Sequence, residues 1–131
     1  WKEGEDYATA IGPCRTFVFF HEIEYLFANG LVKGGDVDNA IVIVEHPVQK
    51  EQLERMSQLF DVPCLEVKEG YLNNLSLRFP NECARHKLLD IMGDLRLAGG
   101  FLKAHIEGYK SGHRINTIVA SQIRNQIKSK K

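Results

Sequence analysis

The chain has 131 residues, of which 44% are hydrophobic and 26% are charged, so it is long enough to bury a hydrophobic core. Its 17 lysine and arginine residues are balanced by 17 aspartate and glutamate residues, and this balance argues against a nucleic-acid or anionic-membrane partner. No apolar run is long enough to span a bilayer, and the acidic residues 1–6 do not resemble a secretory signal. Three scattered cysteines, Cys14, Cys64 and Cys83, indicate reduced thiols in a cytoplasmic protein.

The first elements predict a β-α-β unit over about residues 15–44. Residues 15–20 are rich in aromatic and β-branched side chains, as strands are. Hydrophobic residues then recur at helical spacing up to a stop at Gly30. After a turn at residues 34–36, the almost entirely apolar run 39–44 predicts a strand covered on both faces.

Residues 45–74 are expected to add a helix and further extended structure. Pro47 is expected to open a helix, which the run 61–63 ends. Extended structure is expected to resume from Leu65 to Lys68.

The last third predicts a helix, a strand and a second helix. The first helix begins near Asn81 and stops at the glycines 99–100, and residues 101–110 then alternate as a strand does. Ser111 is expected to cap the final helix. The order of elements indicates an α+β fold, an α/β two-layer sandwich in which one sheet is packed with helices. We expect one domain over residues 1–127 and a basic tail at 128–131. Because no initiator methionine is present, we also expect the chain to be a piece of a longer protein; processing of the N-terminus is the alternative.

Three polar residues occupy one face of the helix that follows Asn81. His86 and Asp90 are one helical turn apart, about 6 Å along the axis, so both could bind one metal ion. Asp90 and Asp94 repel each other by about 0.2–0.5 kcal/mol unless a cation lies near them. Because a catalytic zinc takes about three protein ligands, His86 and Asp90 would be an incomplete site. The alternative is a solvated polar face.

His113 follows Gly112 at a junction where an imidazole would be exposed and a substrate could come near the backbone. If Asp94 meets His113, the carboxylate would orient the ring and favour its charged form. Lys87 and Lys110 flank these residues and could hold phosphate groups. The alternative is that these side chains are simply solvated.

Four segments in this order and spacing resemble the UDP-3-O-acyl-N-acetylglucosamine deacetylases. They include the motifs HKLLD, GDL and KSGH, and they cover residues 15–17, 34–40, 85–95 and 109–113. The resemblance extends over essentially the whole chain, but only over the second domain of the family. Residues 45–74 are longer than the corresponding connection in compact members of the family, which implies an elaboration there. It implies a zinc-dependent cytoplasmic amidase of lipid A synthesis.

The resemblance also implies the roles of individual residues. His86 and Asp90 would be zinc ligands, whereas the third ligand and the glutamate general base would lie in an N-terminal domain that is absent here, so that the fragment alone would be inactive. His113, oriented by Asp94, would stabilise the oxyanion or protonate the leaving amine. The β-α-β insert would form a passage for the acyl chain. The implied substrate-binding residues are Thr16, Phe17, Phe19, Ile23, Leu26, Val32, Gly35, Val37, Lys87, Lys110 and Gly112.

The implied partners are the N-terminal domain of the same enzyme, the UDP-linked acylated glucosamine and, in fused members of the family, a C-terminal dehydratase domain. Two other readings stay open. The chain could be a non-catalytic module that binds a nucleotide-sugar or an acyl chain, or a structural interaction domain. In addition, the hydrophobic residues assigned to the passage could be ordinary core.

Overall fold

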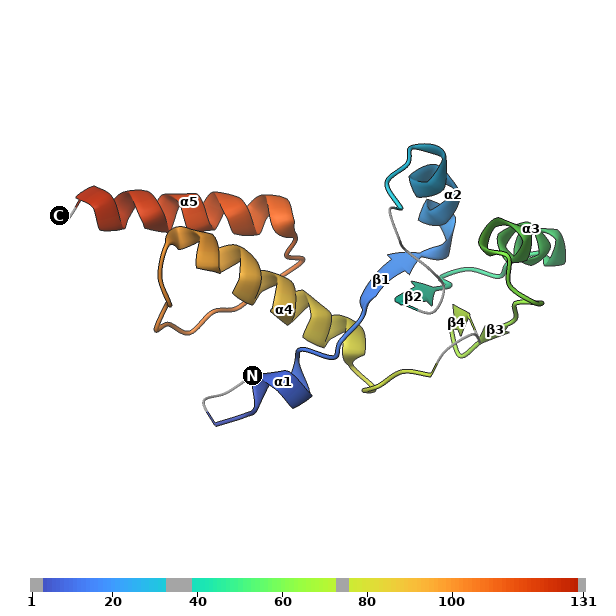
Figure 1. Ribbon diagram of the computed structural model, residues 1–131, viewed down its shortest axis with the longest axis horizontal. Coiled ribbons are helices and arrows are strands. Elements are labelled where there is room, and N and C mark those ends of the chain that lie inside the picture. Colours follow the sequence, from blue (N-terminus) through green and yellow to red (C-terminus); the bar gives the residue numbers. More distant parts are fainter. Residues whose placement is uncertain (1–3, 33–38, 73–75, 130–131) are drawn as a thin grey trace. The chain divides into compact units, whose positions relative to one another are not determined.

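The computed structural model describes residues 4–32, 39–72 and 76–129 (Figure 1). They form helices and a mixed four-stranded sheet, which confirms the predicted α+β class. The chain divides into two compact units, residues 15–83 and residues 1–14 with 84–131. The predicted domain bounds, 1–127 with a tail at 128–131, stay a prediction.

The unit of residues 15–83 begins with the predicted β-α-β arrangement. Strand β1 (Thr16–Phe19) lies parallel to β2 (Ala40–Ile43), and helix α2 (Phe20–Ala28) follows β1 directly. Ile41 and Val42 of β2 are only 0% and 4% exposed. The apolar run therefore marks a strand that is covered on both faces, as predicted.

A short hairpin completes the sheet. Strands β3 (Val67–Lys68) and β4 (Tyr71–Leu72) are antiparallel, and β4 pairs with β2, so the strand order is β1-β2-β4-β3. Both residues of the connecting turn, Glu69 and Gly70, have positive φ angles of 53° and 82°, as a tight hairpin turn requires. The extended structure predicted at residues 65–68 is thus present in part, and β4 was not predicted.

Helix α3 (Lys50–Phe60) packs its apolar side onto the core of this unit. It begins after Gln49, whose backbone N–H donates to Gln52 Oε1 at 3.0 Å, and not at Pro47 as predicted. It ends at Asp61, which takes a left-handed conformation with φ 51°. The buried core residues of the unit are Ile23, Val42, Val44, Met56, Leu65 and Leu72.

The other unit is helical. It contains α1 (Tyr7–Ala10), most of α4 (Glu82–Leu95), a short 3-10 helix (Arg96–Ala98) and α5 (His113–Ser129). The helix predicted from Asn81 is therefore confirmed as α4. Helix α5 begins at His113, and the Asn116 N–H donates to the Gly112 carbonyl at 3.0 Å, so Gly112 and not Ser111 stands at its N-cap. None of the described helices is long and apolar enough to cross a membrane.

The strand predicted at residues 101–110 is wrong. Residues 101–112 contain neither helix nor strand, and Phe101 and Ile106 are 91% and 48% exposed. A strand must pair its backbone N–H and C=O groups with a neighbouring strand, and no strand in the described part of the chain pairs with this segment. Alternation of apolar and polar residues alone does not supply that neighbour.

Candidate metal and catalytic site

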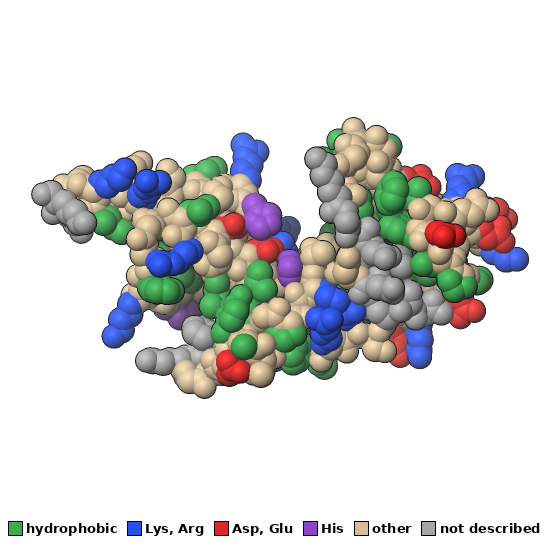
Figure 2. Space-filling view, in the orientation of Figure 1, with side chains coloured by type: hydrophobic (Ala, Val, Ile, Leu, Met, Phe, Trp, Pro, Cys, Tyr) green, Lys and Arg blue, Asp and Glu red, His purple; other side chains and the backbone are tan. Residues whose placement is uncertain are grey.

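The polar face of α4 is largely buried. The side chains of His86, Asp90 and Asp94 are only 16%, 7% and 15% exposed. Figure 2 shows histidine side chains next to carboxylates in the unit that contains α4 and α5. Because buried carboxylates require compensating partners, this face is not the freely solvated surface that was the alternative reading.

The partner of His86 Nδ1 fixes how its imidazole is protonated. Nδ1 lies 3.0 Å from the Cys14 carbonyl oxygen, which can only accept a hydrogen bond. Nδ1 therefore carries the proton, and in the neutral ring the lone pair is on Nε2. Nε2 lies 3.5 Å from Asp90 Oδ1.

The two donor atoms of His86 and Asp90 fit half of a zinc site. Two ligand atoms at about 2.1 Å from a tetrahedral ion are about 3.4 Å apart, which agrees with the 3.5 Å between His86 Nε2 and Asp90 Oδ1. The buried Asp90 Oδ2 is paired with Lys87, whose Nζ lies 2.6 Å away. The described residues contain no cluster of three or more potential metal ligands.

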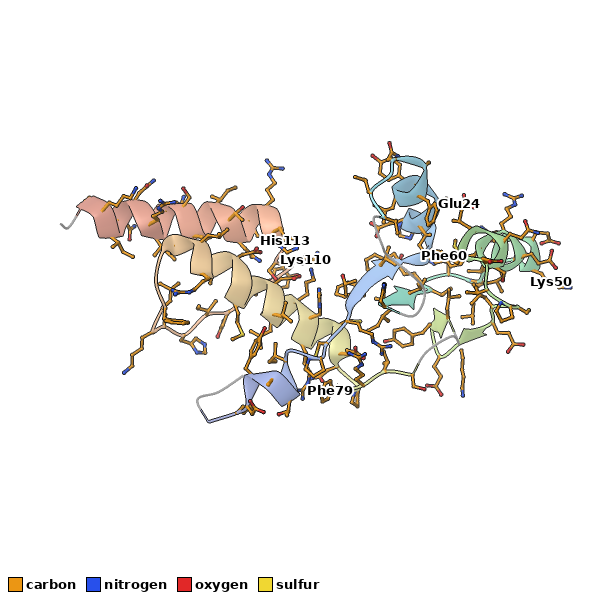
Figure 3. The ribbon with its side chains drawn as sticks, in the orientation of Figure 1. Glu24, Lys50, Phe60, Phe79, Lys110 and His113 are labelled. Atoms are coloured by element: carbon orange, nitrogen blue, oxygen red, sulfur yellow. The ribbon has the colours of Figure 1, made fainter. Side chains whose placement is uncertain are left out.

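His113 joins the two aspartates of α4 from the start of α5 (Figure 3). Its Nδ1 lies 2.9 Å from Asp94 Oδ2, its Nε2 lies 3.9 Å from Asp90 Oδ1, and its side chain is 70% exposed. Asn116 Nδ2 also donates to Asp94 Oδ2 at 2.9 Å. The predicted meeting of Asp94 and His113 is therefore present in the structure.

Asp94 is ionised in this environment. Burial acts to raise the pKa of Asp94, but the hydrogen bonds from Asn116 and His113 outweigh it, and the pKa lies below its ordinary value. An ionised Asp94 accepts a hydrogen bond from His113 Nδ1 and so orients the imidazole. An exposed, oriented imidazole can give or take a proton at Nε2.

Three residues predicted to bind the substrate, Lys87, Lys110 and Gly112, lie near these side chains in the sequence and have different surroundings. Lys87 pairs with Asp90, whereas Lys110 is exposed, with its Nζ 5.6 Å from the centre of the Tyr109 ring. Lys110 lies in the segment before α5 (Figure 3) and has a left-handed φ of 48°. A Cβ atom added to Gly112 would meet nothing within 4 Å, so there is open space beside its backbone.

The remaining predicted substrate residues belong to the unit of residues 15–83. Thr16 is exposed on β1, and the rings of Phe17 and Phe19 meet edge to face at 6.3 Å. Ile23 is 2% exposed within the core, and the next two residues of the set, Leu26 and Val32, are half-buried. Gly35 and Val37 lie outside the described residues.

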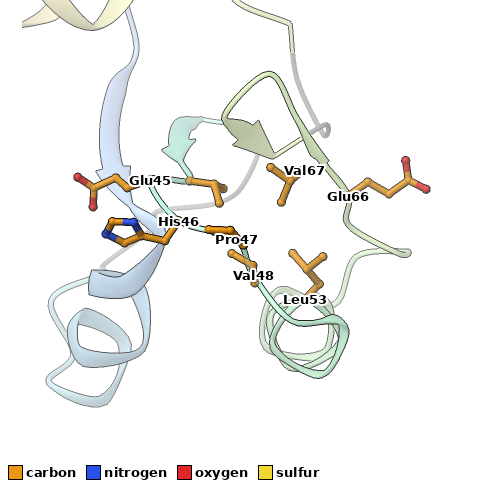
Figure 4. A pocket seen from close by; sticks show the side chains of 8 residues that line it. Glu45, His46, Pro47, Val48, Leu53, Glu66 and Val67 are labelled. Carbon is orange, nitrogen blue, oxygen red and sulfur yellow. The ribbon is translucent and has the colours of Figure 1, made fainter.

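A cavity of about 510 Å³ opens in the elaboration after β2 (Figure 4). Its walls are mainly apolar, with two glutamates and a histidine among them. The lining residues are Val44, Glu45, His46, Pro47, Val48, Leu53, Glu66 and Val67. No residue of the predicted site contributes to it.

Sequence reasoning missed three contacts. Asn116 binds Asp94 from one turn after His113, a spacing that could have suggested it. The Cys14 carbonyl, which lies beside His86, has no side-chain signal. The third is a buried ion pair, in which Arg15 Nε lies 2.9 Å from Glu82 Oε1; the two residues are far apart in sequence, so no local pattern reveals it.

Comparisons with known proteins agree with the motifs. The family described as UDP-3-O-acyl N-acetylglycosamine deacetylase, LpxC, matches residues 2–60 and 64–125. The chain is 44% identical over 128 residues to a bifunctional enzyme LpxC/FabZ of Bacteroides thetaiotaomicron, an alignment that covers 97% of this chain and 28% of that protein.

Two further relatives have similar identity. A bifunctional enzyme LpxC/FabZ of Porphyromonas gingivalis is 44% identical over 124 residues, which are 94% of this chain and 27% of the relative. A UDP-3-O-acyl-N-acetylglucosamine deacetylase of Syntrophotalea carbinolica is 41% identical over 119 residues, which are 91% and 31%. The chain spans less than a third of the length of these curated relatives. On the evidence of the family match and these identities, the chain belongs to the LpxC family of UDP-3-O-acyl N-acetylglycosamine deacetylases.

Proposed function

We propose that this chain is the C-terminal half of a zinc-dependent deacetylase of lipid A biosynthesis in the cytoplasm. The whole enzyme would hydrolyse the acetamide of UDP-3-O-acyl-N-acetylglucosamine and release acetate. Family membership supports the reaction. The observation that carries the proposal is that Asp90 Oδ1 lies 3.5 Å from His86 Nε2 and 3.9 Å from His113 Nε2, so a ligand pair and an exposed imidazole meet at one oxygen.

His86 would bind the zinc ion through Nε2, and Asp90 through its carboxylate. Bound zinc supplies Lewis-acid polarisation of the acetamide carbonyl and activation of a water molecule. Because about three protein ligands are usual, we propose that the third ligand and the general base lie in an N-terminal domain outside this chain. The fragment alone would then bind zinc weakly and show no turnover.

His113 would stabilise negative charge and donate a proton at the reacting amide. Protonated at both nitrogens, it would donate from Nε2 to the leaving amine or stabilise the oxyanion of the tetrahedral intermediate. Asp94 and Asn116 hold the Nδ1 side through hydrogen bonds to one carboxylate oxygen. Their role would be to keep Nε2 turned toward the substrate.

The substrate would contact several further elements. Thr16 would lie near the reacting carbonyl, Lys87 and Lys110 near the diphosphate, and Gly112 where its open space admits the sugar. The β-α-β insert would enclose the acyl chain, because an alkyl chain needs a dry, apolar passage. The residues proposed for this passage are Phe17, Phe19, Ile23, Leu26, Val32, Gly35 and Val37.

A dehydratase domain is proposed to follow this half of the enzyme. Two of the relatives with 44% identity are named bifunctional enzyme LpxC/FabZ. The intact mass of the natural protein, purified from its source, would test this arrangement, since a single-function deacetylase would be far shorter.

Substitutions in the full-length protein test the catalytic assignment. We expect His86→Ala and Asp90→Ala to lose both zinc and deacetylation, and His113→Ala to retain zinc while its rate falls by about 10²–10⁴-fold. His105→Ala is the matched control, because this histidine is 86% exposed and contacts only the exposed Glu107 among the pairs described. Zinc content is measured by metal analysis and activity by acetate release.

A second experiment separates the two halves. We expect the fragment to be inactive alone and to gain zinc and activity when the separately produced N-terminal domain is added. If His86→Ala retained full zinc and activity, the catalytic assignment would fail. A mixture that forms the complex, binds the nucleotide-sugar and stays inert would favour the non-catalytic binding module instead.

A further inference from the structure

The segment that precedes β1 contacts α4 beside the proposed zinc ligand. Arg85 Nη1 donates to the Ala10 carbonyl at 2.8 Å, and His86 Nδ1 lies 3.0 Å from the Cys14 carbonyl. Arg85 and His86 are consecutive residues of α4. The helix therefore holds the segment at two carbonyl groups that are four residues apart.

Local hydrogen bonds and buried side chains give this segment a defined conformation. Asp6 caps α1, because its Oδ1 accepts a hydrogen bond from the Ala8 N–H at 3.1 Å. The Cys14 N–H donates to the Ile11 carbonyl at 3.0 Å, and the Ile11 and Cys14 residues are only 2% and 5% exposed. The Cys14 carbonyl is thus carried by a turn that is closed by its own hydrogen bond and anchored by two buried side chains.

The position of the Cys14 carbonyl decides which nitrogen of His86 can bind a metal. A carbonyl held at Nδ1 keeps the proton there and leaves the lone pair on Nε2, which faces Asp90. Without that acceptor the ring could take the other tautomer or rotate, and Nε2 would no longer be a fixed donor. Partners of this kind, behind a metal ligand, commonly contribute about 10–100-fold to metal affinity.

We propose that Arg85 is a positioning residue for metal binding, which holds the segment 6–14 so that the Cys14 carbonyl fixes the orientation and tautomer of His86. This inference rests on the proposed function, in which His86 is a zinc ligand. Arg85 itself contacts neither the metal nor the substrate in this account. It acts through Ala10 and the turn to Cys14.

Two substitutions of Arg85 in the full-length protein test the inference, since a backbone carbonyl cannot be removed by ordinary mutation. Arg85→Met keeps most of the aliphatic stem and removes the donor to Ala10. Arg85→Lys keeps a charged donor and serves as the conservative variant if the methionine variant does not fold. Arg124→Met is the matched control, because Arg124 is exposed on α5.

Two readouts are measured on zinc-free protein. Zinc affinity is determined by competition with a chelator, and the tautomer of His86 by long-range proton–nitrogen NMR with ¹⁵N-labelled histidine. We expect Arg85→Met to lose at least about 10-fold in zinc affinity and to lose the Nδ1–H signature of His86. Arg85→Lys should recover most of both, and Arg124→Met should match the wild type.

Wild-type zinc affinity in Arg85→Met would overturn the proposal. So would a loss of affinity with the His86 tautomer unchanged, because the effect would then not pass through the Cys14 carbonyl. Failure of the proposed function has a different signature. In that case His86→Ala would bind zinc as tightly as the wild type, whatever Arg85 does.

Discussion

Substitution of Glu82 by glutamine should destabilise the unit of residues 15–83. Glu82 is 1% exposed, and its two carboxylate oxygens accept four hydrogen bonds. Three donors belong to Arg15, namely its backbone N–H, Nε and Nη2, and the fourth is the Arg78 N–H at 2.7 Å. A glutamine amide has only one acceptor oxygen, so its NH2 group would face donors and the Arg15 charge would lose its counterion.

The loss of stability follows from the burial of the Arg15–Glu82 ion pair and from the pKa of Glu82. Removing one partner of a buried ion pair typically costs about 3–5 kcal/mol. Burial acts to raise the pKa of Glu82, but the hydrogen bonds from Arg15 and Arg78 lower it from 4.5 to about 2. That difference corresponds to about 3 kcal/mol, in agreement with the lower end of the first range.

The same pKa predicts how stability depends on pH. Because the pKa of Glu82 is lower in the folded state than in the unfolded state, its contribution is fully present above the unfolded value of 4.5. The contribution is lost as the pH falls from about 5 to about 2. Glu82→Gln should therefore be less stable than the wild type at neutral pH and should lose less stability on acidification.

Urea unfolding followed by circular dichroism at several pH values measures both effects. Glu54→Gln is the matched control, because Glu54 forms an exposed pair with Lys50 at 3.5 Å on α3, and such pairs contribute about 0–1 kcal/mol. If Glu82→Gln were as stable as Glu54→Gln at neutral pH, the buried pair would not stabilise the fold. An acid dependence equal to that of the wild type would show that another carboxyl group causes it.

Three further predictions concern the site and the cysteines. In the full-length enzyme, Asp94→Asn should retain zinc while kcat falls by about 10²–10⁴-fold, because His113 loses its carboxylate partner; loss of zinc with kcat unchanged would contradict this role. Asn116→Ala should raise the pKa of Asp94, which the Asn116 hydrogen bond helps to lower, so the acidic limb of the kcat/KM profile should move to higher pH; an unchanged profile would count against it. Iodoacetamide should label Cys64 before Cys14 and Cys83, because Cys64 is exposed, Cys14 is buried and burial raises the pKa of the Cys83 thiol; peptide mass spectrometry with equal labelling at all three would refute the ordering.

The fold could be predicted where a pattern is local. The β-α-β unit follows from an aromatic strand, a glycine stop and an apolar strand, and each signal lies within a few residues. The start of α3 was misplaced because the prediction relied on Pro47. The helix begins instead where the Gln49 N–H donates to Gln52 Oε1 and the Gln52 N–H donates to the Gln49 carbonyl. The segment 101–110 was mispredicted because a strand depends on a neighbour, which a single segment cannot reveal.

The candidate site could also be predicted only where the pattern is local. Helical spacing correctly placed His86, Asp90 and Asp94 on one face, since the period of an α-helix fixes that relation. The contact of His113 with Asp94 joins different helices and was expected from the family resemblance, not from spacing. The Cys14 carbonyl could not be foreseen, because any residue type presents the same backbone atom.

Helical periodicity also says which residues share a face without saying whether that face is buried. In α4 the apolar Ala84 is exposed, whereas the polar Asp90 is only 7% exposed. Contacts from outside the helix explain this burial. His86 is hydrogen-bonded to the Cys14 carbonyl, and the first turn of α5 brings His113 toward Asp90 and Asp94. A carboxylate that is solvated on an exposed helix needs no cation, but a buried one needs a compensating partner, and Lys87 Nζ lies 2.6 Å from Asp90 Oδ2. Burial and Lys87 therefore fix where the Asp90 carboxylate lies, and the helical spacing brings its Oδ1 to 3.5 Å from His86 Nε2, where one metal ion could contact both atoms.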